Sequence, residues 1–582
     1  MAKTSKHDIK TYVVRRAEAL LLQRSSYEPI MKDLRDYILP EIGQSLSNDP
    51  TSQQDAQGQR HDGKIINSMP TNAALTLAAG MQAGITSPSA PWFRITVPYD
   101  WMYEVSEIRD WLDYVQDVLM RIFAMSNMYK VFHQCYMHMA VWGTACAIVV
   151  EDDESIVHGY MLDQGSYAIG LNKRGQVDTI FREFSMTYSQ LADEFGKDSL
   201  PQSIQEKLIS VSKGHRDDDG FCNVSCLIEP NSDAIDVPEI MGAPFRSIYW
   251  LPKNAADNDN EGIIAIRHYS GNPILCPRWM ESPGVGNYGY GPGRISLGDC
   301  MQLQEMEKDK LKAIRKVVDP PLAVPDTLKG QLINTYPGSL TYFSSAGLTA
   351  GKSSVTPLYE VRPDLGALEN AISTVENRIR NMFYYDLFKM FTDMGYKNPP
   401  TAQEIIEKKQ EKLINLGPVV ESMTNDLDRV INRVFQVAWE KKLVPPPPLK
   451  MLQVARGNSL NLRVKYISPL ATAQRMIGLQ ALQQYSQYVA QMATIKPDAV
   501  DKLNVDGALD HAAVSLGVPA NVVPGVKEVA AIRGERAKQQ EAVKQQEAAI
   551  AASQAAKNLG QAKMTPDTGL GALRQSIMGA AA

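Results

Sequence analysis

The stretch that decides the fold is GYGPGRISLGDCMQLQEMEKDKLKAIRKVVDPPLAVP, residues 289–325. Three glycines and a proline open it, and a run rich in good helix formers then continues to Val318. Asp319-Pro320-Pro321 ends the run, because proline has no N–H donor and its ring clashes inside a helix. We therefore predict a first long helix over residues 294–318, which at ~1.5 Å per residue is roughly 36 Å long.

A second long helix is predicted to begin near Pro363, beyond a short β-containing segment at residues 319–360. Six of its apolar residues alternate spacings of three and four, the pattern of a coiled-coil seam: Leu365, Leu368, Ile372, Val375, Ile379 and Met382. Such a seam is most simply core, and part of that core can form between subunits. Two long helices around a small β insert indicate a stalk with a knob at its end.

The rest of the chain predicts an α+β fold that is mostly helical. Apolar residues recur at helical spacings in the first ~90 residues and in residues 104–126. Residues 143–290 instead hold short β-rich runs separated by turn residues. The segment TDMGYKNPPT, residues 392–401, breaks the second long helix, and a further long helix follows it. Strands do not alternate with helices as they do in a βαβ array.

The C-terminal part is predicted to be helical beyond a stiff linker of prolines at residues 445–448. Its end, from Val526 to Gln561, is rich in Ala, Gln, Glu and Lys, so it has high helix propensity but only a weak apolar stripe. A helix of this kind is marginal alone. We expect it to need neighbours, most simply copies of itself.

Composition restricts the classes of function. The 582 residues are enough for more than one packing unit, and 44% hydrophobic and 21% charged residues are ordinary for a soluble globular protein. The formal net charge is −5, whereas a protein that clamps nucleic acid statically usually carries a basic excess. Any contact with DNA should therefore be loose or local. No apolar run has the length of a membrane span and the N-terminus lacks the apolar core of a secretory signal, so we expect no membrane association and a cytosolic location in the producing cell.

No metal or cofactor is predicted. The six cysteines are expected to be buried or idle thiols; Cys222 and Cys226 lie four residues apart, but no second pair completes a zinc-binding set. Asp257 to Gly262 resembles the start of a calcium-binding loop, yet His268 stands where that loop needs Glu.

The segment most like an enzyme motif is Ala346 to Ser353, which ends in GKS as a phosphate-binding P-loop does. Ala346 replaces the first glycine of that motif. Pro357 and the β-branched residues before it prevent the helix whose N-terminus would hold the phosphates. We therefore predict that the chain is not an enzyme.

The order of these segments resembles that of the head-to-tail connector, or portal, proteins of short-tailed, podovirus-type bacteriophages. Besides residues 289–325, the matching stretches are YILPEIG (37–43), APWFRI (90–95), YPGSLTYF (336–343), NMFYYDLFKMF (381–391), PTAQEIIEKKQEKLINLGPVVESM (400–423) and SPLATAQR (468–475). Two departures stand out. Gln403 occupies the place of a second Thr in the family's TATE-like motif, and the Ala- and Gln-rich tail follows no fixed family pattern.

The resemblance implies the portal fold, whose parts are called wing, stem, clip and crown, and its assembly into a ring. By matching order, the parts are the wing (1–293, with a helical and a β-rich part, and its long helix 402–445), the first stem helix (294–318), the clip (319–360), the second stem helix (361–391), the channel or tunnel loop (392–401) and the crown (446–582).

The resemblance also implies a function and partners. A portal forms the channel at one capsid vertex through which the genome is packaged and ejected. The ring is usually dodecameric, and double-stranded DNA passes through it without sequence specificity. The clip would meet terminase and later the tail adaptor and tail proteins, while the wing would meet the major capsid and scaffolding proteins. The expected location is the portal vertex of the virion, and the host cytoplasm during assembly.

Three sets of candidate site residues follow from the resemblance. The seam residues are candidates for the subunit interface of the stem. The channel-loop candidates are Thr392, Asp393, Met394, Gly395, Tyr396, Lys397 and Asn398. The candidates at the basic, clip-side end of the first stem helix are Lys308, Lys312, Arg315 and Lys316.

Plainer interpretations stay open for the last two sets. The loop can be an ordinary helix-helix connection, and the basic residues can be a solvated face with cations placed favourably near a helix C-terminus. Two rival functions also stay open. One is a packaging-motor ATPase subunit, which the broken P-loop disfavours, and the other is an internal scaffold protein that uses the helical tail.

Overall fold

The computed structural model describes residues 6–561 except 47–63, 98–104, 213–219, 232–242, 253–262, 282–285, 319–321, 324–355, 358–363, 390–401, 449–450, 452–462, 468, 497, 499–501 and 517–525. The chain divides into two compact units. Unit 1 comprises residues 1–99 and 107–481, and unit 2 comprises residues 100–106 and 482–582. The order of elements confirms a mostly helical α+β fold.

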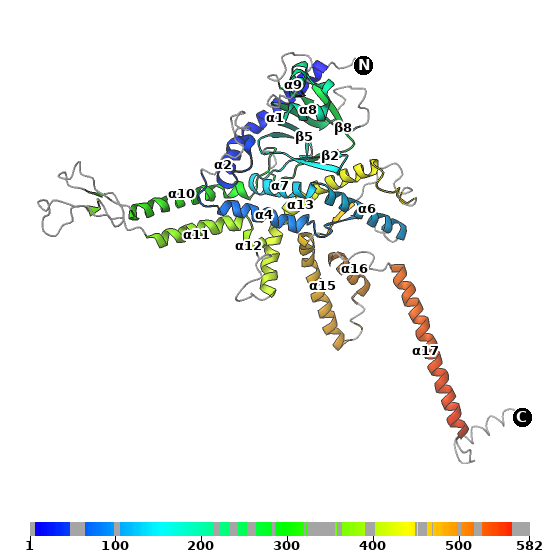
Figure 1. Cartoon of the computed structure of the whole chain (residues 1–582). Helices are drawn as coiled ribbons and strands as arrows, with labels where there is room; N and C mark the ends of the chain where they lie inside the picture. The colour runs from blue at the N-terminus through cyan, green and yellow to red at the C-terminus, as the bar shows by residue number, and fades with distance from the viewer. Residues whose placement is uncertain are drawn as a thin grey trace, which may run out of the picture. The chain divides into compact units, whose positions relative to one another are not determined.

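Two antiparallel sheets form the β-rich part of unit 1, as the sequence predicts for residues 143–290 (Figure 1). One sheet has the strand order β4-β5-β6-β7-β8, and the other has the order β3-β2-β9. The strands are β2 (Ala147–Asp152), β3 (Ile156–Met161), β4 (Tyr167–Leu171), β5 (Val177–Thr187), β6 (Phe221–Pro230), β7 (Phe245–Trp250), β8 (Ile263–Tyr269) and β9 (Ile274–Leu275).

Helix α1 (Lys6–Ser25) covers one face of the five-stranded sheet. The core between them consists of Ile9, Val13, Ala17 and Leu20 from the helix and of Ala168, Phe181, Leu227, Ile248 and Trp250 from the strands. Because neighbouring side chains of a strand point to opposite faces, Phe181 of β5 points toward α1, whereas Arg182 points toward the other sheet.

The helical part of unit 1 is centred on α7 (Met128–Trp142), which the sequence analysis did not assign. Eleven of its side chains are buried, from Met128 to Trp142. It packs against α4 (Met69–Ile85) and α2 (Glu28–Ile38), whose buried residues Met31, Leu34 and Ile38 belong to the stripe predicted for the N-terminal region. The remaining helices are α6 (Ser106–Met125), α8 (Tyr188–Phe195) and α9 (Gln202–Ser212).

The glycine-rich segment 289–293 packs directly against the end of α7. Gly143 caps that helix with a left-handed φ of 77°, and a Cβ added there would lie 2.5 Å from backbone atoms of Tyr290. A Cβ on Gly293 would in turn lie 2.9 Å from the Cα of Val141. These glycines therefore allow two stretches of backbone to touch, and they fix where α10 begins.

The first long helix, α10 (Pro292–Val318), ends at the residue predicted. The second differs from the prediction of one helix within residues 361–391. Helix α11 (Leu365–Met382) ends at a turn through Phe383 and Tyr384, and the short α12 (Tyr385–Lys389) follows. Tyr384 has a left-handed φ of 53°. The turn lets Phe388 pack on Gly80 of α4, where no side chain stands in its way.

Helix α13 (Ala402–Glu440) continues through Pro418 and contacts β2, β3 and β9. One face of this helix is buried, and its residues recur at helical spacings: Val420, Met423, Leu427, Val430, Ile431 and Val434. Two short strand pairs complete unit 1. Strand β1 (Phe93–Thr96) pairs with β12 (Arg463–Tyr466), and β10 (Leu322–Ala323) pairs with β11 (Thr356–Pro357), which brings the two ends of the predicted clip together.

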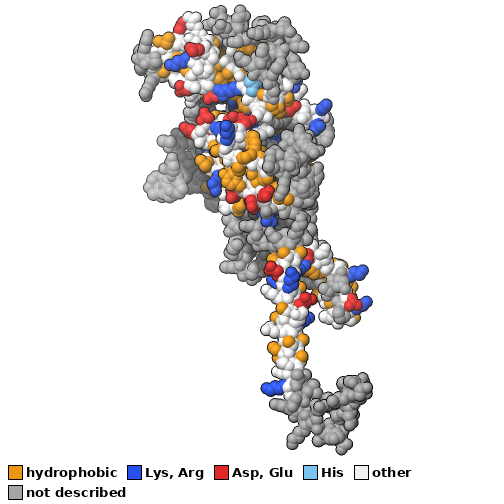
Figure 2. Space-filling view, turned by 90° about the vertical axis from the view of Figure 1, so that its right-hand side faces the viewer, with side chains coloured by type: hydrophobic (Ala, Val, Ile, Leu, Met, Phe, Trp, Pro, Cys, Tyr) orange, Lys and Arg blue, Asp and Glu red, His pale blue; other side chains and the backbone are white. Residues whose placement is uncertain are grey.

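Unit 2 holds the C-terminal half of α15 (Pro469–Ile495) together with α16 (Val505–Leu516) and α17 (Val526–Gln561). Arg533 of α17 forms an ion pair of 2.6 Å with Asp506 of α16. From residue 530 to residue 554 every side chain of α17 is exposed, and Figure 2 shows separate hydrophobic patches along this helix in its lower part. The weak apolar stripe predicted for this segment is therefore unburied within the described chain.

Candidate channel and subunit-interface surfaces

Helices α10 and α11 lie side by side as an antiparallel pair (Figure 1). Lys310 contacts Glu369 at 3.2 Å, and Arg378 contacts Asp299 at 3.1 Å. The two ion pairs run in opposite order along the two helices, which fixes the antiparallel direction. We call this antiparallel pair the stem pair.

Burial divides the six seam residues into two groups. Ile372, Val375 and Ile379 are buried within the chain itself, against α10 and α4. Leu365 and Met382 are 38% and 44% exposed, and Leu368 is half-buried. Only this second group remains available for a contact with another subunit.

The opposite helix of the stem pair shows the same division. Leu303 and Cys300 of α10 are fully buried, whereas Ile295 and Leu311 are 50% and 46% exposed. The exposed apolar residues of α10 and α11 are those that the packing inside one chain does not use. They are therefore the surface that a second copy can cover.

A polar cluster around one buried side chain joins the stem pair to the segment before α4. Gln304, which is 4% exposed, accepts hydrogen bonds through Oε1 from the backbone N–H groups of Ile66 (2.7 Å) and Asn67 (2.9 Å). Its Nε2 donates to the carbonyl oxygen of Asn67 at 2.8 Å. The Asn67 side chain donates to Glu307 of α10 at 3.0 Å and to Glu376 of α11 at 2.9 Å. We call Gln304, Asn67, Glu307 and Glu376 the stem clasp.

The stem clasp fixes both stem helices relative to the helical part of unit 1. Every polar group of the Asn67 side chain has a partner, since its Oδ1 also accepts from the backbone N–H of Met69 at 2.9 Å. A buried polar network that is fully satisfied stabilises one arrangement over its alternatives. Sequence analysis did not single out these residues, although Gln304 stands next to buried Leu303 on the apolar side of α10.

Charges on α10 alternate in sign. Lys308 pairs with Glu305 at 3.3 Å, and Lys312 pairs with Asp309 at 2.9 Å, each one turn apart. The hydrogen bond from Lys312 lowers the pKa of Asp309 below its ordinary value. Of the four predicted basic candidates, Lys308 and Lys312 are thus locally neutralised. Arg315 and Lys316 are exposed in the last turn, with no ion pair among the described residues.

The channel-loop candidates, Thr392 to Asn398, lie outside the described residues, as do the P-loop-like segment 346–353 and the calcium-loop-like segment 257–262. All six cysteines are free and buried. Burial raises the pKa of the Cys300 thiol to about 12, so this thiol is protonated and unreactive at neutral pH. Across the described ranges, His, Cys, Asp and Glu nowhere gather into a group that could hold a metal.

None of the described helices combines the length and the apolar composition that crossing a membrane requires. The aromatic residues Trp92, Phe93, Phe383 and Phe388 are all buried. Trp92 is the centre of one cluster, with its ring stacked on Tyr466 at 6.2 Å and edge-on to Phe123 at 5.7 Å.

Comparison with known proteins identifies the class to which this fold and these surfaces belong. Residues 10–523 match the family described as bacteriophage head to tail connecting protein, and the chain belongs to that family. Its function is therefore that of a portal, or head-tail connector, protein, and it is a structural component of the virion.

Individual relatives agree with this assignment. The chain is 35% identical over 529 residues to the "Probable portal protein" of Bordetella phage BPP-1, covering 90% of this chain and 91% of the relative. It is 32% identical over 576 residues to the "Portal protein" of Salmonella phage epsilon15, covering 98% of each. A solved structure titled "Neck of empty GTA particle computed with C6 symmetry" is 10% identical, with a TM-score of 0.33 over 72% of this chain and 87% of that chain. These matches give no support to the packaging-motor or scaffold alternatives.

Proposed function

We propose that twelve copies of this chain, the usual number in the family, close into a ring around a channel for double-stranded DNA. The observation that carries the proposal is the stem pair. Its buried residues Ile372, Val375 and Ile379 hold α10 and α11 together, while Leu365 and Met382 stay exposed for a neighbouring copy. A pair of packed helices with an exposed apolar face can make the same contact with each neighbouring copy around an axis.

The charges of α10 support passage of DNA without sequence specificity. Each phosphate that Lys or Arg neutralises releases counterions, with a salt slope of about −0.9 per contact on B-DNA. A continuous basic surface would therefore hold the duplex. On α10 the pairs Lys308–Glu305 and Lys312–Asp309 interrupt such a surface, and the whole chain carries a formal net charge of −5. The channel-loop candidates around Lys397 would touch the DNA backbone only transiently.

The proposed parts follow the order of the chain. Residues 1–293 and 402–445 form the wing, 294–318 and 361–391 the two parts of the stem, 319–360 the clip, 392–401 the channel loop, and 446–582 the crown. The clip is proposed to bind terminase during packaging and tail adaptors afterwards, and the wing to contact capsid and scaffolding proteins. The ring would assemble in the host cytoplasm and occupy one capsid vertex, where the genome enters and leaves. No enzymatic activity is part of the proposal.

Negative-stain images of the purified protein test the ring. Closed rings with a hole wide enough for duplex DNA are expected, whereas monomers or open filaments under all conditions would rule the proposal out. Nucleotide binding tests the motor alternative. Saturable ATP binding that is lost in Lys352→Ala would favour a packaging ATPase instead, because Lys352 is the lysine of the P-loop-like segment.

A further inference from the structure

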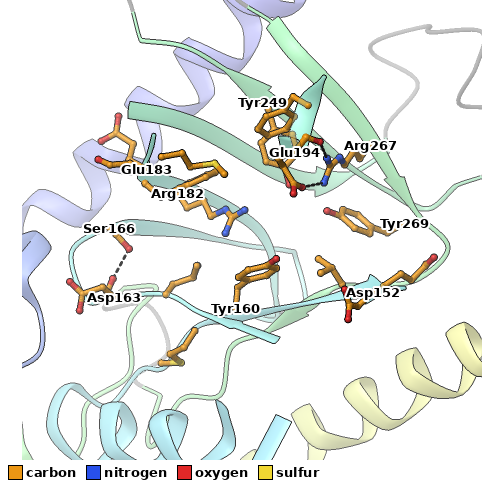
Figure 3. Close-up of a pocket in the computed structure, with 18 of the residues that line it drawn as sticks. Asp152, Tyr160, Asp163, Ser166, Arg182, Glu183, Glu194, Tyr249, Arg267 and Tyr269 are labelled. Atoms are coloured by element: carbon orange, nitrogen blue, oxygen red, sulfur yellow. Dashed lines mark hydrogen bonds and ion pairs between the residues drawn. The ribbon is translucent and has the colours of Figure 1, made fainter. Parts of the chain in front are cut away.

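A cavity of ≈ 1110 Å³ lies between the two sheets of unit 1 (Figure 3). The three-stranded sheet contributes Tyr160 of β3, and the five-stranded sheet contributes Arg182 of β5, Tyr249 of β7 and Tyr269 of β8. The cavity is remote in sequence from the stem pair, and the proposed channel makes no use of it. Its volume slightly exceeds the ~300–1,000 Å³ of pockets for drug-sized ligands, which is enough for a short stretch of peptide.

Arg182 brings a positive charge into this cavity. Its guanidinium lies 4.3 Å from the ring centroid of Phe184 and 5.9 Å from that of Tyr160, and it points into the cavity. Its buried Nε has no hydrogen-bond partner, and no carboxylate among the described residues forms an ion pair with Arg182. Arg182 is half-buried, and a cation partly withdrawn from water without a counterion is costly.

The neighbours of Arg182 cannot supply that counterion. Burial raises the pKa of the Cys226 thiol, and burial likewise raises the pKa of the Tyr249 hydroxyl well above its ordinary value, so both groups are neutral at pH 7. Glu194 is already held by Arg267, which donates to its carboxylate at 2.6 Å and to its backbone carbonyl at 3.0 Å. None of these neighbours therefore serves as a direct counterion for Arg182.

Hydroxyl donors surround the same space. Tyr160 and Tyr269 line the same cavity as the Arg182 guanidinium (Figure 3). Burial, followed by the nearby charge of Glu194, raises the pKa of Tyr160, so its hydroxyl stays protonated and can donate a hydrogen bond. A guanidinium with neutral hydroxyl donors beside it is suited to a carboxylate.

The rim of the cavity has the opposite charge. Asp152, Asp163 and Glu183 line it together with Glu194 (Figure 3). Asp163 is held by the backbone N–H groups of Gly43 (2.9 Å) and Ser45 (3.0 Å), and Asp152 by Ser155, so these carboxylates are fixed in place. An acidic rim repels a polyanion such as DNA and attracts basic groups. Arg182 inside the cavity and the acidic residues at its rim together favour a ligand that carries one negative charge between positive charges.

We propose that this cavity is a docking site for an extended segment of another protein chain, in which one Asp or Glu carboxylate pairs with Arg182 and the flanking residues are Lys or Arg. The inference goes beyond the proposed channel, since it rests on the charges of this cavity and holds whether or not copies of the chain form a ring.

Two synthetic peptides test the proposal on the full-length protein by isothermal titration calorimetry. The first is acetyl-Lys-Ala-Glu-Lys-amide, and the second has Gln in place of Glu. We expect the Glu peptide to bind at least about tenfold more tightly, because only its carboxylate can neutralise Arg182. Equal affinity of the two peptides would overturn the proposal.

Variants then assign the effect to Arg182. Arg182→Met should abolish the preference for Glu, while the matched control Arg174→Met, at an exposed position of the β4–β5 turn, should leave it unchanged. If Arg182→Met fails to fold by circular dichroism, Arg182→Lys replaces it and should weaken the Glu peptide by about threefold or more, since an ammonium lacks the planar fork. An unchanged preference in both Arg182 variants contradicts the assignment.

Competition with small anions identifies the source of the carboxylate. Succinate and inorganic phosphate, each at the concentration of the peptide, should not displace it. Displacement by succinate would show a site for a free carboxylate, and displacement by phosphate would show a site for a phosphate group. Either result rejects a protein segment as the occupant.

Discussion

Gln304 and Asn67 bind each other through two hydrogen bonds that run in opposite directions. The Asn67 backbone N–H donates to Gln304 Oε1 at 2.9 Å, and Gln304 Nε2 donates to the Asn67 carbonyl oxygen at 2.8 Å. These two residues are 237 positions apart in the chain. The pair is thus the point at which the stem pair is tied to the segment that leads into α4.

Replacing Gln304 with Met tests how much these hydrogen bonds contribute to the stability of the fold. Met has a similar volume but no amide, so the N–H groups of Ile66 and Asn67 lose the acceptor that the buried Gln304 side chain provides, and we expect a loss of about 2–4 kcal/mol in the free energy of unfolding. Chemical denaturation measures it. Gln302→Met, two residues away at an exposed position, is the control and should change stability by about 0.5 kcal/mol or less. Equal losses of stability in the two variants would show that the hydrogen bonds of Gln304 contribute no more than the amide of exposed Gln302.

A second prediction concerns the close contact of two backbones at Gly143. Gly143→Ala forces a Cβ to within 2.5 Å of Tyr290 backbone atoms, and neither α7 nor the start of α10 can move without opening the core. We expect the variant to lose about 4 kcal/mol or more, or not to fold. Soluble yield and thermal melting are the measurements.

Gly175 provides the matched control for Gly143. Its φ of 76° is nearly the same as the 77° of Gly143, but a Cβ added there meets nothing within 4 Å. Gly175→Ala therefore carries only the cost of a left-handed alanine, about 1–2 kcal/mol. If the two variants melt alike, backbone strain alone explains the requirement for glycine at residue 143.

The elements that could be predicted from the sequence are those with a local signal. Pro320 and Pro321 end α10 at Val318, and the spacing of Val420, Met423 and Leu427 gives the buried face of α13. Alternation and turn residues likewise locate most strands of the two sheets. Each of these signals acts within a few residues, so neighbours in the sequence are sufficient to read it.

The elements that were missed depend on contacts far along the chain. Helix α7 is buried on nearly all sides, so its sequence MYKVFHQCYMHMAVW shows no helical stripe. The turn at Tyr384 contains no glycine or proline, and it is set by the fit of Phe388 on Gly80. The stem clasp joins Asn67 to residues more than two hundred positions later, which no local pattern can indicate.

The division of the seam leads to a third prediction. Leu368 is half-buried in one chain, so Leu368→Asp should leave the chain folded but prevent closed rings, because the charge would lie in the contact with the next copy. Ile372 is 4% exposed, and Ile372→Asp should instead cost about 3–5 kcal/mol and lower the melting temperature. Ser373→Asp, on the exposed face, is the control and should do neither. Intact rings from Leu368→Asp would exclude the exposed seam as an interface.

A fourth prediction concerns pH and Asp426 of α13. Burial raises the pKa of this carboxyl to about 6, although Arg429, at 3.0 Å, lowers it. The pKa in the unfolded chain is about 3.9. Between about pH 4 and pH 6 the folded chain therefore keeps a proton that the unfolded chain has released. This stabilisation is complete below the unfolded pKa and is lost as the pH rises through the folded pKa.

Asp426→Asn should remove that dependence. At pH 8 we expect the variant to be more stable than the unsubstituted chain by up to about 3 kcal/mol, and at pH 4 the two should be equal. Denaturant midpoints at the two pH values give the comparison. Asp309→Asn, at a fully exposed carboxyl whose pKa is lowered by Lys312, should show no such gain at pH 8. A constant difference between Asp426→Asn and the unsubstituted chain at both pH values would refute the burial of a charge at this position.

The last prediction concerns the direction of dependence between α17 and the ring. The side chains of α17 from residue 530 to residue 554 are exposed, and its ion pair between Arg533 and Asp506 is itself exposed, so the described chain gains little from the helix. A polar helix of this kind is marginal alone, and copies brought together by a ring would supply its neighbours.

Deletion of residues 530–582 should therefore leave closed rings in negative-stain images and leave the melting temperature of the body unchanged. Arg533→Ala, which removes only the ion pair, should match the full-length chain in both respects. Loss of rings on deletion, with rings kept in Arg533→Ala, would show that α17 helps to build the ring and does not merely depend on it.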